Sequence, residues 1–158
     1  MIIFRPTTAI ALWLCLIFAS SSNAYTVQQE QDTSPKTLRG NWLYHWGDLP
    51  KDETSNQWQY QQVEWTEIEF PENMPNRQGE NIVWVKIDLP FGNWRDPYLF
   101  INAIDLTFEA FHNQQKIYHF GKIDHQGNSN FEGWPWHAFR LPDNYDQHTL
   151  YFRIASDY

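Results

Sequence analysis

The sequence predicts an all-β protein built as a two-sheet antiparallel sandwich, and three observations support this class. Short segments repeatedly alternate apolar and polar side chains, which is the pattern of a strand with one buried face. Polar stretches separate these segments at spacings typical of sandwiches, and no helix-period pattern exceeds about two turns. The chain has 158 residues, 42% hydrophobic and 18% aromatic, which provides apolar surface for one core and argues against two full domains.

The first expected strands are residues 40–46 and 64–70, and Pro71 ends the second of them. The alternation is clearest in residues 81–89, where valine, isoleucine and leucine side chains at the odd positions share one side and Trp84 lies on the other. We therefore expect this segment to border the core.

The middle of the chain predicts three further strands. Residues 98–103 are apolar on both faces, which indicates an interior strand. Residues 105–112 alternate again, and residues 115–120 follow after only two residues. Asn113 and Gln114 therefore predict a two-residue hairpin turn, with the asparagine in the left-handed conformation.

The last expected strands are residues 136–141 and 148–155, which both alternate apolar and polar side chains. Binding residues of sandwiches tend to lie in the connections between strands. The long polar connections are residues 25–36, 51–60, 71–80 and 122–135.

Residues 1–24 have the layout of a secretory signal peptide. Arg5 provides the positive charge, and the apolar run of residues 9–18 is shorter than the roughly 20 residues that span a bilayer. We expect cleavage after Ala24; an uncleaved anchor that starts at Ile2 is the alternative.

The predicted export places the folded part of the chain in the periplasm or on the extracellular face of the inner membrane. Residues 25–37 are expected to form a flexible leader, and residues 38–158 the domain. The single cysteine, Cys15, would leave with the signal peptide, which excludes disulfide and cysteine-nucleophile chemistry in the exported product.

Composition and motifs argue against several function classes. The net charge is −8, with 11 Lys and Arg against 19 Asp and Glu, so a nucleic-acid partner is not expected. The sequence has no Gly-x-Ser-x-Gly motif and no phosphate loop. The carboxylate pairs Glu67–Glu69 and Asp105–Glu109 are typical of solvated strand faces. We predict no catalytic residue, no enzyme activity and no cofactor.

Metal binding has two weak candidates in the sequence. The histidine-rich set consists of His112, His119, Asp124 and His125, whose spacing fits no tight motif. Loop oxygens for calcium belong to Asp48, Asp52, Glu53 and Asp143, without an Asp-x-Asp-x-Asp-Gly loop. We assign no metal ligand and leave calcium open.

Three stretches of the sequence follow one another in a recognisable order. Residues 40–47 (GNWLYHWG) have the pattern of an opening strand, residues 107–121 that of a hairpin, and residues 136–141 followed by 150–158 that of closing strands. In this order they resemble the periplasmic sensor domains of bacterial seven-transmembrane receptors with diverse intracellular signalling modules. Gln114 stands where the family usually has Gly. The resemblance covers residues 38–158 and implies a jelly-roll fold of the galactose-binding-like type.

The resemblance also implies a role. Such a domain would sense a small-molecule or carbohydrate ligand for a membrane receptor. Intact relatives continue into seven membrane helices and a diguanylate cyclase, histidine kinase or nucleotide cyclase module, so the membrane-embedded partner segment is expected to be missing from this chain. The alternative is a secreted carbohydrate-binding module or an accessory domain of a glycoside hydrolase.

The abundant tryptophans divide into two groups. Trp42 and Trp84 lie in strand patterns and are expected in the core. Other indoles lie in or beside loops, where they can stack on a sugar ring, with Asn93 and Tyr98 as polar partners. The predicted ligand contacts are Trp94, Arg95, Trp134, Trp136 and His137.

Overall fold

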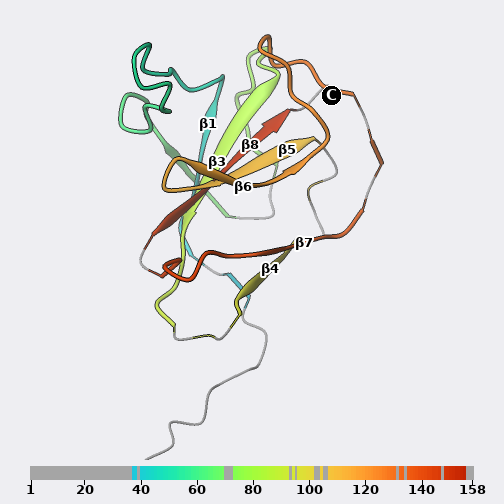
Figure 1. Cartoon of the computed structure of the whole chain (residues 1–158). Helices are drawn as coiled ribbons and strands as arrows, with labels where there is room; N and C mark the ends of the chain where they lie inside the picture. Colours follow the sequence, from blue (N-terminus) through green and yellow to red (C-terminus); the bar gives the residue numbers. More distant parts are fainter. Residues whose placement is uncertain are drawn as a thin grey trace, which may run out of the picture. The chain divides into compact units, whose positions relative to one another are not determined.

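The computed structural model describes residues 37–38, 40–69, 73–92, 94, 96–101, 104, 107–130, 132–133, 135–146 and 148–155. These residues form eight strands and no helix (Figure 1). The strands are β1 (Trp42–Trp46), β2 (Thr66–Ile68), β3 (Ile82–Asp88), β4 (Tyr98–Ile101), β5 (Phe108–His112), β6 (Gln115–Phe120), β7 (His137–Arg140) and β8 (Thr149–Ala155). The expected signal peptide and leader, residues 1–24 and 25–37, lie outside the described residues apart from Thr37.

The strands of the described residues make two antiparallel sheets, which confirms the predicted fold class. The larger sheet has six strands in the order β2-β1-β3-β8-β5-β6, and β4 pairs with β7 in a sheet of two (Figure 1). None of the described residues belongs to a helix long and apolar enough to span a membrane.

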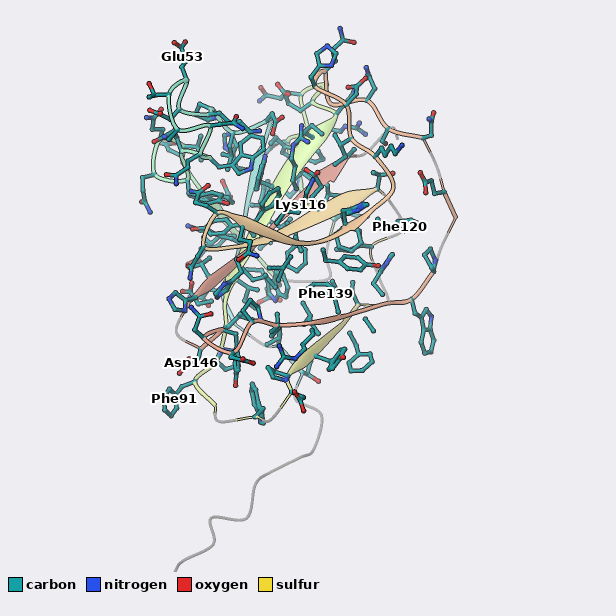
Figure 2. All side chains as sticks on the ribbon, in the orientation of Figure 1. Glu53, Phe91, Lys116, Phe120, Phe139 and Asp146 are labelled. Carbon is teal, nitrogen blue, oxygen red and sulfur yellow. The ribbon has the colours of Figure 1, made fainter. Side chains whose placement is uncertain are left out.

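The main core lies between the two sheets. Val83, Val85 and Ile87 of β3 are buried there, as the alternation of residues 81–89 predicts. Phe139 of β7 belongs to the same core, and Figure 2 shows its side chain on the side of β7 that faces the larger sheet. Its ring stacks on Tyr118 of β6 with 4.6 Å between centroids, which ties the small sheet to the large one.

A second core covers the other face of the six-stranded sheet. Trp84 is fully buried on that face, although the alternation of its strand predicts that this side is exposed to solvent. Trp58 and Tyr60, from the connection between β1 and β2, pack against its ring with centroids 4.8 and 5.9 Å away. Part of the connection at residues 51–60 therefore packs on this face, and we call this connection the lid. Both faces of the central strands are buried.

The short turn between β5 and β6 is confirmed. Asn113 and Gln114 have φ angles of 47° and 69°, the left-handed pair that a two-residue hairpin requires. The Gln114 side chain explains why a glycine is dispensable there. Its Nε2 donates to the Trp58 carbonyl at 2.8 Å, and its Oε1 accepts from the Trp58 backbone N–H at 2.9 Å. The turn therefore holds the lid in place.

The prediction that residues 98–103 form an interior strand is wrong. β4 covers Tyr98–Ile101 and pairs with β7 alone in a two-stranded sheet. Leu99 and Ile101 pack toward the main core, whereas Phe100, like Tyr98, is exposed. Apolar side chains on both faces of this strand reflect an uncovered outer face rather than burial on both sides.

Candidate functional site

Three exposed aromatic side chains gather on the outside of the small sheet. Tyr98 and Phe100 lie on alternate positions of β4 and are 55% and 76% exposed. Trp136 stands immediately before β7 and is 86% exposed. We call Tyr98, Phe100 and Trp136 the aromatic surface.

The strand register places these side chains on one face. Phe100 pairs with Ala138, and Tyr98 pairs with Arg140. Residues directly opposite each other in an antiparallel pair point to the same side of the sheet. Trp136 continues the alternation of Ala138 and Arg140 by two residues, so its indole faces the same way as the two β4 rings.

Charged groups border the aromatic surface at the end where Tyr98 lies. Nη2 of Arg140 donates to Oδ1 of Asp96 and to Oδ1 of Asp143. The hydrogen bond with Asp143, followed by that with Asp96, raises the pKa of Arg140 above its usual value. A ligand on the rings would therefore meet guanidinium donors and carboxylate acceptors side by side.

Of the predicted ligand contacts, Trp136 is exposed, whereas Trp94 packs against the protein. Trp94 is half-buried, and its ring stacks on Tyr145 with 5.8 Å between centroids and an angle of 10°. The Tyr145 hydroxyl donates to the Gly92 carbonyl at 2.7 Å, which fixes this part of the connection before β4. Trp94 thus packs against the main core. Arg95 and Trp134 lie outside the described residues.

His137 faces the core and not the aromatic surface. It is 2% exposed, its Nδ1 lies 3.1 Å from the Tyr118 hydroxyl, and its ring meets Phe108 edge-on at 4.8 Å. Burial lowers the pKa of this imidazole. The alternation of residues 136–141 predicts that His137 and Trp136 lie on opposite sides, because neighbouring side chains on a strand point to opposite faces.

Phe100 is the member of the aromatic surface that the sequence did not indicate. Its segment is apolar throughout, and periodicity alone does not distinguish a buried face from an uncovered one. Arg140 points to the same face as Tyr98, but this polar neighbour is recognised only once the register of β4 and β7 is known.

The described residues contain no group of three or more His, Cys, Asp or Glu side chains placed to hold a metal ion. Glu109, one of the paired carboxylates, is held by two cations. Its Oε1 accepts from Nζ of Lys116 at 2.7 Å, and its Oε2 accepts from Nη1 of Arg153 at 3.3 Å. Its partner Asp105 lies outside the described residues.

Comparisons with protein-family models, with curated proteins and with solved structures found no match.

Proposed function

We propose that the chain is an extracytoplasmic domain that binds a carbohydrate on the aromatic surface and serves as the ligand-sensing part of a bacterial membrane receptor. The observation that carries this proposal is the exposure of Tyr98, Phe100 and Trp136 on one face of a two-stranded sheet. A galactose-binding-like jelly roll is the finer fold that accompanies it.

Leaving three aromatic rings in water has a cost that a ligand removes. Exposed apolar patches mark interaction sites, and an aromatic ring accepts the apolar face of a sugar. A sugar that covers about 50 Å² of a ring gains about 1.3 kcal/mol at roughly 25 cal/mol per Å². Three rings then give about 4 kcal/mol, which corresponds to a millimolar Kd. Affinity is therefore expected to rise with the number of sugar units.

Sensing requires that the ligand bind two arrangements of the domain unequally. A sugar that seals the outer face of the β4–β7 sheet stiffens the layer that packs on the main core, and a membrane partner would read this change as a shift in population. The competing function, a secreted carbohydrate-binding module or an accessory domain of a glycoside hydrolase, uses the same surface without a signal.

A thermal-shift screen of neutral oligosaccharides and soluble polysaccharides tests ligand binding. A ligand that binds only the folded chain raises the melting temperature, by the equivalent of about 2.7 kcal/mol at 100 times its Kd. No stabilisation by any sugar would overturn the carbohydrate assignment.

The gene downstream of codon 158 tests the receptor assignment. An in-frame continuation with about seven apolar spans of roughly 20 residues supports the receptor. A stop codon, or an in-frame catalytic domain, supports the module instead.

A further inference from the structure

A hollow of about 540 Å³ lies on the face of the six-stranded sheet that points away from the aromatic surface. It sits over β5, β6 and the segment that follows β6, in the region of Lys116 in Figure 2. Its charged lining consists of Glu109, Lys116, Lys122 and Asp124, with His119 beside them. The volume is in the range of small-molecule sites.

A partly buried ion network fixes the floor of the hollow. The Glu109 side chain is 14% exposed and lies between Lys116 and the 7% exposed Arg153. A carboxylate held from both sides keeps its position when a ligand arrives.

The wall of the hollow is equally well fixed. Oδ1 of Asp124 accepts from the backbone N–H groups of Gln126 and Asn128, both at 2.8 Å. A bridge between Ile123 and Ser129 closes the loop. Such a preformed site loses little conformational entropy on binding.

The two lysines of the hollow, Lys116 and Lys122, keep free N–H donors. Both oxygens of Glu109 already accept from cations, and Asp124 is occupied by its own loop. Lys116 uses one of its three N–H groups on Glu109. Among the described residues, no hydrogen bond or ion pair involves the ammonium group of Lys122. Free ammonium donors on two lysines suit a ligand group that is rich in oxygen and carries negative charge.

We propose that this hollow binds a sugar acid, a monosaccharide with one carboxylate. The carboxylate would lie between Lys116 and Lys122, and the hydroxyls would meet the side-chain amide of Asn130, which lines the same hollow. This second site depends on neither the aromatic surface nor the receptor role.

Calorimetric titration of the purified chain with D-glucuronate, D-glucose and acetate tests the proposal. The three probes separate the carboxylate from the hydroxylated ring. We expect glucuronate to bind more tightly than either of the others. Absence of glucuronate binding up to about 10 mM, or equal binding of glucose or acetate, would overturn the proposal.

Two charge-matched variants locate the site. Lys122→Gln removes an exposed ammonium group that has no hydrogen bond or ion pair with any described residue, so the fold should be retained. It is expected to weaken glucuronate binding about fivefold, the effect of losing one partly exposed ion pair. Lys51→Gln is the control, because Lys51 lies over the Trp58 ring and outside the hollow. Equal weakening in both variants, or in neither, would refute the assignment.

A third variant separates this proposal from the carbohydrate function. Trp136→Ala is expected to leave glucuronate binding unchanged, because Trp136 belongs to the aromatic surface. Loss of glucuronate binding in Trp136→Ala would show that the sugar acid occupies the aromatic surface and would refute the hollow.

Discussion

Removal of the Asp48 carboxylate is expected to destabilise the domain strongly. Oδ1 of Asp48 accepts from Nε of Arg153 and from Nε1 of Trp84, each at 2.9 Å, and Oδ2 accepts from Nη2 of Arg153. The Arg153 side chain is 7% exposed on the face covered by the second core. Burial alone lowers the pKa of Arg153, and the hydrogen bonds and charges of Asp48 and Glu109 outweigh it and raise the pKa.

The magnitude follows from what Asp48→Ala leaves behind. Of its two carboxylate partners, the buried guanidinium of Arg153 would keep Glu109, at 3.3 Å. Breaking a buried ion pair costs roughly 3–5 kcal/mol. Because the Asp48 side chain is 36% exposed and water can replace part of it, we expect the lower end, about 3 kcal/mol. Asp48→Asn keeps an acceptor oxygen and is expected to cost about 1.5 kcal/mol.

Urea denaturation followed by tryptophan fluorescence at neutral pH measures these changes. The double variant Asp48→Ala/Arg153→Met carries no buried unpaired charge, so it should be more stable than Asp48→Ala alone. The reasoning is refuted if Asp48→Ala lies within about 1 kcal/mol of the wild type, or if the double variant is the less stable of the two.

Two further predictions concern the turn and the buried histidines. Gln114→Gly relieves about 1 kcal/mol of left-handed strain but removes two hydrogen bonds to Trp58, each worth about 1 kcal/mol. Its melting temperature should therefore fall, and a rise would contradict the role of this side chain. Stability should also decrease as the pH falls below about 6.5. Burial lowers the pKa of His112, with a contribution from neighbouring His148, and burial lowers the pKa of His137. The unfolded chain then binds protons before the folded one, so stability is complete above the unfolded pKa of 6.5 and is lost toward the lower folded pKa values. The slope reaches at most about 1.4 kcal/mol per pH unit for each histidine. Denaturation midpoints from about pH 7.5 to 5 check this, with His112→Asn/His137→Asn as the comparison; equal slopes in the two proteins would argue against the histidines.

Much of the fold could be predicted because side-chain alternation reports directly on strand faces. Residues 81–89 and 148–155 became β3 and β8 within one residue at each end, and Asn113 marked the hairpin. Side-chain alternation does not show which strands pair with each other. Nothing local to residues 98–101 shows that β4 pairs with β7 in a two-stranded sheet, and the lid over Trp84 depends on contacts between residues far apart in sequence.

In the candidate site too, features of one strand could be predicted, whereas features that depend on contacts between distant segments could not. The exposure of Trp136 could be predicted from its place beside a polar loop, and the burial of His137 follows from the alternation of residues 136–141. Phe100 could not be predicted, since its exposure follows from how few strands the small sheet has. The glutamine at position 114 is explained only by Trp58, 56 residues away.

Affinity electrophoresis in gels that contain neutral soluble polysaccharides tests the central claim most directly. At least one polysaccharide should retard the wild type, and Trp136→Ala and Tyr98→Ala should lose most of this retardation. The matched control is Phe91→Ala, because Phe91 is 76% exposed and lies apart from β4 in Figure 2. Retardation of the wild type and Phe91→Ala alone is the predicted result. Equal retardation of Trp136→Ala, or none of the wild type in any gel, would contradict carbohydrate binding on the aromatic surface.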